Sequence, residues 1–211
     1  MQLNSATDAL LVVDVQNDFC PGGALAVDRG DEVVPIINRL GQRFEHVVLT
    51  QDWHPRGHIS FASAHSGRKP FETIESVYGA QALWPDHCVQ ATPGADFHPG
   101  LQLPHAELIV RKGFRRDIDS YSAFLENDHT TPTGLAGYLR ERALKRLFVC
   151  GLAYDFCVRH SAIDGTALDF ECVVIEDACR AVRLPGSVEA ADQAFLEAGI
   201  PRISANEIAP G

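Results

Sequence analysis

Long apolar runs, paired cysteines and an excess of basic residues are all missing from this sequence of 211 residues. No stretch approaches the roughly 18 consecutive apolar residues that a membrane-spanning helix needs. The opening residues, MQLNSATDALLVVD, lack the basic segment and the small-residue cleavage site of a signal peptide. We therefore expect no membrane partner and a cytoplasmic location.

Positive charge is scarce. The chain has 18 Lys and Arg against 28 Asp and Glu, a formal net charge of -10 at pH 7. A phosphate backbone or an anionic membrane surface would be repelled by this mean field. We therefore expect no nucleic-acid partner, and a small neutral or cationic ligand fits better.

The six cysteines occur singly, without the CxxC spacing of a zinc ribbon or a thioredoxin motif. The chain is also too large to need disulfides for its stability. We expect reduced thiols. For any one of them, the default interpretation is a small buried hydrophobic side chain.

Internal repeats and low-complexity tracts are absent as well, and nothing in the sequence suggests a coiled coil or a filament. With 45% hydrophobic residues the chain is long enough to bury a substantial core. Length and composition together predict a single domain over residues 1–211.

What the sequence does contain is a series of short, β-branched apolar runs separated by helical patterns. Such runs are typical of parallel strands that are buried on both faces. We expect strands at 9–13, 46–50, 107–110, 146–150 and 171–175, with a weak one at 202–204, and helices at 134–143, 155–168 and 188–198. This alternation predicts an α/β fold: a three-layer, open, mostly parallel β-sheet with helices on both faces.

One long segment, about residues 55–104, does not follow this pattern. It is rich in His, Pro and Gly and shows little periodicity. It is too long to be a plain connector, and long irregular loops in compact domains tend to be functional.

Chemically useful side chains follow the predicted strands. Asp14 comes after the first run, Asp52 and His54 after the second, Lys112 after the third and Cys157 shortly after the fourth. In open α/β sheets, ligands bind beyond the carboxyl ends of the strands. We therefore expect an acid, a metal-binding pair, a base and a thiol to meet at one edge of the sheet.

Cys157 is the candidate nucleophile. Asp155 is a good N-cap residue, so the thiol is expected in the first turn of the following helix, where the dipole and Lys112 lower the pKa of a thiol. The alternative is an inert buried cysteine at a helix start. The same turn offers the backbone N–H groups of Ala153 and Cys157 as a candidate oxyanion hole.

Asp14 and Lys112 are candidate catalytic residues because we expect them close to Cys157. Alone, Asp14 could be a turn former and Lys112 a solvated lysine at a strand end. Together at the sheet edge of Cys157, Asp14 could first take the thiol proton and later give it to a departing amine.

A metal site is expected from Asp52, His54 and His87. Asp52 and His54 are two residues apart, so on an extended strand end they project to the same side. Three N and O ligands leave coordination positions open, which is the pattern of a catalytic site, and zinc, iron or manganese would accept them. The alternative is that these are polar loop residues that bind nothing.

Three aromatic residues lie in irregular segments near the expected site: Phe19, Trp84 and Tyr121. Each alone could be an ordinary core residue. Around a metal, their faces could enclose a flat heteroaromatic ring.

Nearly the whole chain resembles the nicotinamidase/pyrazinamidase branch of the isochorismatase-like cysteine hydrolases. The segments that carry the resemblance are LLVVDVQNDFCPGGAL from Leu10, TQDWHPRGHISFA from Thr50, WPDHCVQATPGADFHP from Trp84, RKGF from Arg111, DSYSAF from Asp119 and VCGLAYDFCV from Val149. The three catalytic positions, the metal triplet and the WPxHC segment occur together in the expected order, which makes the match specific.

The resemblance implies an amidohydrolase that converts nicotinamide to nicotinate and ammonia through a cysteine thioester, in pyridine nucleotide salvage, and that also accepts pyrazinamide. It implies one divalent transition metal ion, with zinc as first choice, that contacts the pyridine nitrogen of the substrate. Its residues would be a catalytic triad of Asp14, Lys112 and Cys157, metal ligands Asp52, His54 and His87, and ring-pocket residues Phe19, Trp84 and Tyr121.

The resemblance also implies finer detail. The bond between Leu152 and Ala153 matches a non-proline cis peptide that shapes the oxyanion hole. His58 matches a position that completes the metal shell in some members only, so it is expected next to the ligands rather than among them. Tyr154 departs from the family, where Thr is common, which puts substrate breadth in question.

Other functions remain open at this stage. A related cysteine amidohydrolase could act on an aliphatic amide or a ureido substrate, although such substrates have no ring nitrogen for the metal. A nicotinamide-binding or metal-binding regulator without turnover is a further alternative, and isochorismatase activity is a weaker one. The sequence also leaves open which metal is bound and whether the chain forms a homo-oligomer.

Overall fold

The computed structural model describes residues 1–209, and its centre is a six-stranded sheet in which all neighbouring strands are parallel. The strand order is β5-β2-β1-β6-β7-β8. The strands are β1 (Asp8–Val13), β2 (His46–Asp52), β5 (Leu108–Lys112), β6 (Arg146–Leu152), β7 (Glu171–Arg180) and β8 (Arg202–Ile203). All six predicted strands are present, most of them extending beyond the predicted ends.

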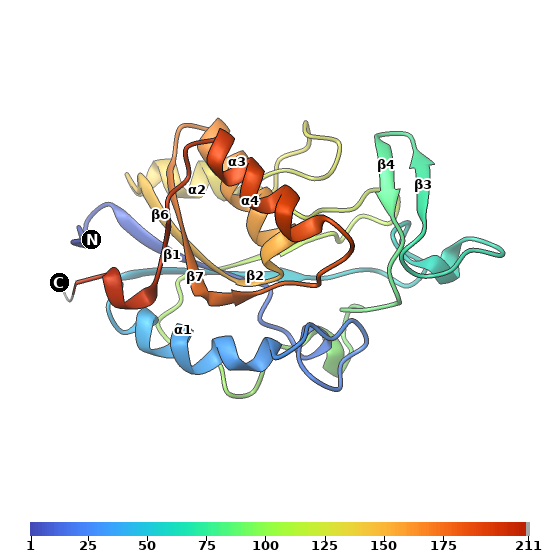
Figure 1. Ribbon diagram of the computed structural model, residues 1–211, viewed down its shortest axis with the longest axis horizontal. Helices are drawn as coiled ribbons and strands as arrows, with labels where there is room; N and C mark the ends of the chain where they lie inside the picture. Colours follow the sequence, from blue (N-terminus) through green and yellow to red (C-terminus); the bar gives the residue numbers. More distant parts are fainter. Residues whose placement is uncertain (210–211) are drawn as a thin grey trace.

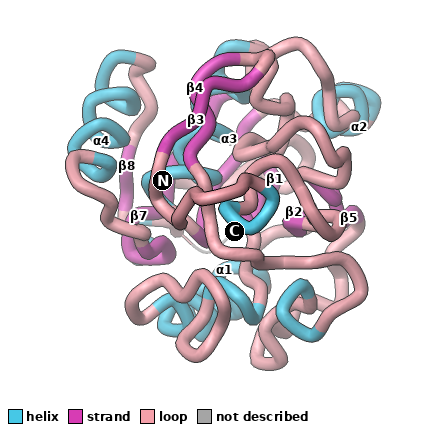
Figure 2. Tube along the Cα trace, turned by 90° about the vertical axis from the view of Figure 1, so that its right-hand side faces the viewer, coloured by secondary structure: helices cyan, strands magenta, loops and turns pink. Residues whose placement is uncertain are grey.

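Helices cover both faces of this sheet (Figures 1 and 2). One face carries α1 (Val33–Gly41), and the other carries α2 (Leu135–Glu141), α3 (Arg159–Ala167) and α4 (Ser187–Glu197). The predicted three-layer α/β fold is thus confirmed. Helix α1 was not predicted, although its buried Val33, Ile37 and Leu40 follow the i, i+4, i+7 spacing of an amphipathic helix.

Burial explains why the central strands form where they do. Every residue of β1 is buried, and β2 and β6 are buried after their first residue. The expectation that all strands are buried on both faces is wrong for β5, where Ile109 is 50% exposed and Arg111 is exposed. β5 and β8 are the two edge strands of the sheet, and β8 is likewise not buried, with Arg202 exposed.

The long segment between β2 and β5 contains a small antiparallel hairpin that the sequence pattern did not indicate. It consists of β3 (Thr73–Ser76) and β4 (Gly79–Ala82) and projects from the body of the molecule (Figure 1). Apart from Gln81 their residues are exposed or half-buried, and Ile74 is the one large apolar side chain among them, so the sequence lacks the apolar alternation of a half-buried strand. Gln81 is the one fully buried residue of the two strands.

The turn that carries Cys157 also differs from the prediction. A short π-helix, Tyr154–Val158, precedes α3, and its N-cap residue is Ala153 rather than Asp155. The Asp155 carboxylate instead accepts hydrogen bonds from the N–H groups of Val182 and Arg183, both at 2.9 Å. The capping role assigned to Asp155 is therefore wrong, because its carboxylate is used to hold the loop after β7.

Among the described residues, no helix combines the length and the apolar character that crossing a membrane would take.

Candidate active site

The polar residues that follow the strands meet at the carboxyl edge of the sheet. Asp14 directly follows β1, Asp52 and Lys112 end the paired strands β2 and β5, and Cys157 lies in the turn after β6. The ligand atoms of Asp14, Asp52 and Cys157 all lie within 4.8 Å of one another. All of these side chains are buried. The structure thus brings the expected acid, base and thiol together.

Lys112 is the centre of this group. Its Nζ lies 2.8 Å from Asp14 Oδ2, 2.5 Å from Asp52 Oδ1 and 3.4 Å from Cys157 Sγ. Burial lowers the pKa of Lys112, but the two carboxylates outweigh burial and hold that pKa well above its usual value. Lys112 therefore remains a cation that faces both acids and the thiol.

Asp14 is held in a fixed orientation. The Thr50 hydroxyl donates a hydrogen bond to Asp14 Oδ1 at 2.6 Å and accepts one from the Asp14 N–H at 3.2 Å. Thr50 was not predicted as a site residue, although it precedes Asp52 by two positions on β2 and so shares its side of the strand.

The two buried carboxylates differ in their acidity. Burial, with a contribution from the Asp52 charge, raises the pKa of Asp14 despite the opposing Lys112. For Asp52, burial also acts to raise the pKa, but Lys112 and His54 outweigh it and hold the pKa well below its usual value. Two neighbouring acids whose pKa values are pushed apart suit different tasks: Asp14 can carry a proton, and Asp52 stays ionised.

The expected lowering of the Cys157 pKa is wrong for the protein alone. Burial raises the pKa of this thiol well above its usual value; Lys112 opposes the rise, and the charges of Asp14 and Asp52 add to it. The thiol is therefore protonated next to a carboxylate that can accept its proton. A cation held by Asp52 would offset one of the two negative charges that disfavour the thiolate.

One feature that the resemblance implied for the segment before Cys157 is present. The peptide bond between Leu152 and Ala153 is cis. The Ala153 carbonyl accepts hydrogen bonds from the N–H groups of Phe156 and Val158, each at 3.1 Å. These two residues flank Cys157, so the two hydrogen bonds hold the backbone on both sides of Cys157.

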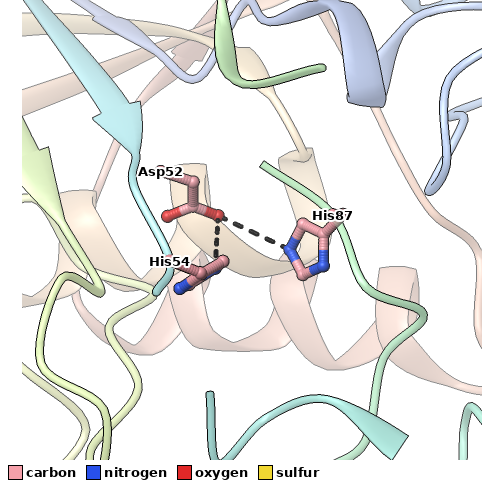
Figure 3. Close-up of side chains that lie close together, drawn as sticks. All are labelled: Asp52, His54 and His87. Atoms are coloured by element: carbon pink, nitrogen blue, oxygen red, sulfur yellow. Dashed lines mark ion pairs between the residues drawn. The ribbon is translucent and has the colours of Figure 1, made fainter. Parts of the chain in front are cut away.

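Asp52, His54 and His87 form a compact group of metal-type donors (Figure 3). Asp52 Oδ2 lies 3.5 Å from His54 Nε2 and 3.8 Å from His87 Nε2. In each histidine, Nδ1 lies close to a backbone carbonyl, that of Gly113 for His54 at 2.9 Å and that of Pro85 for His87 at 2.8 Å. When Nδ1 donates its proton there, the Nε2 lone pair is free for a metal ion, as is usual in metalloproteins.

The donor set therefore fits a divalent transition metal, and the chain has candidate metal-binding residues at the predicted positions. Gly113 contributes to this fit, because a Cβ atom at its position would overlap the His54 ring. Gln16 holds the strand end, since its side chain donates to the Asp52 carbonyl and accepts from the Asp52 N–H, both at 2.8 Å.

His58 lies beside the Asp52, His54 and His87 group and forms a second group of metal-type donors with His54 and Asp119. Its ring stacks on His54 with centroids 4.2 Å apart. Its Nδ1 lies 2.7 Å from the Ser60 hydroxyl, and its Nε2 lies 3.0 Å from the Ile118 carbonyl. Each ring nitrogen of His58 thus has a polar neighbour within hydrogen-bonding distance.

A small cavity connects the thiol with the metal donors. It is lined by Phe19, Leu25, Asp52, His54, Trp84, His87, Asp119, Tyr121, Ala153, Phe156, Cys157 and Val182. The three aromatic residues predicted from the sequence are all in this wall. Leu25, Phe156 and Val182 were not predicted, because apolar loop residues have no pattern that separates a cavity wall from a core.

Tyr154, the position that departs from the resemblance, faces away from this cavity. Its hydroxyl donates to Asp192 Oδ1 at 2.6 Å, and its ring packs on Phe195 of α4 with centroids 5.4 Å apart. It lines a separate hollow next to Arg180. The departure therefore does not change the walls of the cavity that holds Cys157.

Comparison with known proteins gives consistent matches. Residues 8–206 match the model of the isochorismatase domain. A nicotinamidase of Acinetobacter baylyi is 55% identical over 200 residues, covering 95% of this chain and 94% of that protein.

Solved structures agree with the sequence match. A nicotinamidase and pyrazinamidase of Acinetobacter baumanii superposes with a TM-score of 0.95 at 55% identity, covering 96% of this chain and 98% of the other. A protein of L. infantum in complex with nicotinate has a TM-score of 0.87 at 37% identity, covering 99% and 98%. A pyrazinamidase of Pyrococcus horikoshii in complex with zinc has a TM-score of 0.77 at 36% identity, covering 93% and 98%.

Proposed function

The chain belongs to the isochorismatase family, and we infer that it is a nicotinamidase, an amidohydrolase that releases ammonia from nicotinamide and leaves nicotinate. The observation that carries this conclusion is that Cys157 and the metal donors Asp52, His54 and His87 open into the same aromatic cavity. A flat ring with a nitrogen atom and a carboxamide can meet both groups at once. Pyrazinamide has the same two features and is expected to be a second substrate.

The reaction begins at Cys157. Asp14 accepts the thiol proton, and the Cys157 sulfur forms a bond to the carboxamide carbon. Lys112 stabilises the resulting pair of charges, since its Nζ lies within 3.4 Å of both the Asp14 carboxylate and the sulfur. The raised pKa of Asp14 suits a group that must take up a proton and return it.

Negative charge then develops on the carboxamide oxygen. The backbone N–H groups of Ala153 and Cys157 are proposed to donate hydrogen bonds to it. Asp14 returns its proton to the nitrogen, the carbon–nitrogen bond breaks, and ammonia leaves a thioester on Cys157. Water attacks the thioester and gives a proton to Asp14, the carbon–sulfur bond breaks, the Cys157 sulfur takes that proton back from Asp14, and nicotinate is released.

Asp52, His54 and His87 are proposed to hold one divalent transition metal ion, with zinc as first choice and iron or manganese as alternatives. A bound ion would supply Lewis-acid chemistry for a ring nitrogen of the substrate. Phe19, Trp84 and Tyr121 enclose the ring and exclude water, so that the carboxamide reaches Cys157 in one orientation. An aliphatic amide would gain nothing from these contacts, which disfavours the alternative substrate class.

A thiol nucleophile must stay reduced, which favours a reducing compartment. All six cysteines are free and buried, as expected for reduced thiols. We propose that the chain works in the cytoplasm, in pyridine nucleotide salvage, as a single domain that needs no nucleic-acid partner.

The deciding experiment is ammonia release from nicotinamide by metal-loaded protein. Cys157→Ala should abolish release, because no other described thiol lines the cavity. An unchanged circular dichroism spectrum of the variant checks that its fold is intact. Release from an aliphatic amide but not from nicotinamide would overturn the assignment.

A further inference from the structure

The β3–β4 hairpin has one fully buried side chain, that of Gln81. Gln81 has 0% exposure, whereas the other residues of β3 and β4 are exposed or half-buried. The hairpin stands out from the body of the protein (Figure 1). A carboxamide that is buried in such an element needs hydrogen-bond partners.

The amide nitrogen of Gln81 reaches the segment that forms one wall of the ring cavity. Nε2 donates to the Ala82 carbonyl at 2.7 Å, to Asp119 Oδ2 at 2.9 Å and to the Tyr121 hydroxyl at 3.2 Å. It has two hydrogens for these three acceptors, so at least one bond is shared. The carboxylate and the carbonyl accept only, which fixes the orientation of the amide.

The amide oxygen of Gln81 completes the network. Oε1 accepts hydrogen bonds from the Tyr78 hydroxyl at 3.0 Å and from Asn127 Nδ2 at 3.3 Å. Asn127 Oδ1 in turn accepts the N–H of Tyr121 at 3.0 Å. Gln81 is therefore linked to Tyr121 twice, directly at the hydroxyl and through Asn127 at the backbone.

Tyr121 in turn restrains Trp84, a second residue of the cavity wall. Its hydroxyl also accepts the indole N–H of Trp84 at 3.2 Å. Tyr121 and Trp84 both line the ring cavity, whereas Gln81 does not. None of the hydrogen bonds found for Gln81 within residues 1–209 reaches Asp14, Lys112 or Cys157.

We propose that Gln81 is a positioning residue that sets Tyr121 and Trp84 for ring binding, so that the exposed hairpin controls how well the site holds its substrate. This inference rests on the proposed function of the same site. Gln81 acts through the cavity wall and does not contact the reacting atoms. Its loss should therefore weaken substrate binding and spare the chemical step.

The first test compares Gln81→Met with Ser76→Ala. Methionine keeps the length of the side chain and removes every hydrogen bond of the amide. Ser76→Ala removes two hydrogen bonds within the hairpin, from the Ser76 hydroxyl to the Gly79 carbonyl and from the Tyr78 N–H to that hydroxyl, and serves as the control for loosening of the hairpin. We expect Gln81→Met to raise KM for nicotinamide about tenfold with kcat within about twofold, and Ser76→Ala to leave both within about twofold. Equal losses in both variants, or a fall in kcat at constant KM, would overturn the proposal.

A double-mutant cycle tests whether Gln81 acts through Tyr121. Tyr121→Phe removes the hydroxyl that joins Gln81 and Trp84. If the proposal holds, Gln81→Met raises KM much less in the Tyr121→Phe background than in the wild type. Fully additive effects on KM would contradict it.

A spectroscopic measurement separates this inference from the proposed function. The chain has two tryptophans, so a ¹⁵N–¹H spectrum of the metal-loaded protein shows two indole signals, which Trp53→Phe assigns. Gln81→Met should shift the Trp84 signal and leave that of Trp53 unchanged. An unchanged Trp84 signal would overturn the inference. Failure of the wild type to release ammonia would bear on the proposed function, and the indole signals would still decide the role of Gln81.

Discussion

Gly113 is a residue without reactive chemistry that nevertheless fixes a metal ligand. It follows Lys112, has a φ of +62° and accepts the Nδ1 proton of His54 at its carbonyl. A side chain here would be strained in the left-handed region and would also overlap the His54 ring. The position of His54 Nε2 in the donor group therefore depends on the absence of a Cβ atom at the neighbouring strand end.

Gly113→Ala should weaken metal binding, because the added methyl group pushes His54 away from Asp52. A loss of about 10- to 100-fold in zinc affinity is expected, the range seen when groups that orient a ligand are changed. Competition with a chromophoric chelator measures it. Gly137→Ala is the matched control, since Gly137 is exposed on α2 and a Cβ there meets no atom within 4 Å. Equal zinc affinity in both variants would remove Gly113 from this role.

At the scale of elements, Asp155 joins the turn of the nucleophile to the loop between β7 and α4. It is fully buried, accepts the N–H groups of Val182 and Arg183, and also accepts the Ser187 hydroxyl at 2.5 Å. Val182 lines the ring cavity. One carboxylate therefore holds both the turn of Cys157 and a second residue of the cavity wall, Val182.

Asp155→Ala should destabilise the protein and weaken catalysis together. It leaves two part-buried N–H groups without their partner, which costs about 1 to 3 kcal/mol. Urea unfolding measures this cost, and kcat/KM for nicotinamide should fall in parallel. Ser187→Ala removes only one donor to the same carboxylate and should cost about 1 kcal/mol. If Asp155→Ala matched Ser187→Ala in stability, the carboxylate would not be holding the loop.

The elements also show what a sequence can reveal of this site. The β-branched runs correctly predicted the central strands. Asp14, Asp52, Lys112 and Cys157 could be predicted as site residues because they follow these runs within a few residues and parallel strands end at one edge of the sheet. The β3–β4 hairpin could not be predicted from the sequence, since its strands are exposed or half-buried and lack an apolar pattern. The Cys157 pKa could not be predicted, because it depends on burial and on how far each acid lies from the sulfur.

At the scale of the whole molecule, metal binding should be coupled to folding. The three donors come from the end of β2 and from the long segment before β5, so they are close together only in the folded chain. An unfolded chain offers no such set, and ligands that bind only the folded state stabilise it by mass action. Asp52 also contacts Lys112, so the metal site and the catalytic group share one buried carboxylate.

Zinc should therefore raise the melting temperature of the metal-free protein. At a free concentration 100 times the dissociation constant, the gain is about 2.7 kcal/mol, which for a chain of this length corresponds to about 5 to 10 °C. Differential scanning calorimetry with and without zinc measures it, and a strong chelator should reverse it.

His87→Ala removes one donor and should abolish most of the shift, whereas His105→Ala, which changes a histidine outside the donor group, should preserve it. Calcium should give no shift, because a site of two imidazoles and one carboxylate does not suit a cation that prefers oxygen ligands. A full zinc shift in His87→Ala would mean that the ion binds elsewhere.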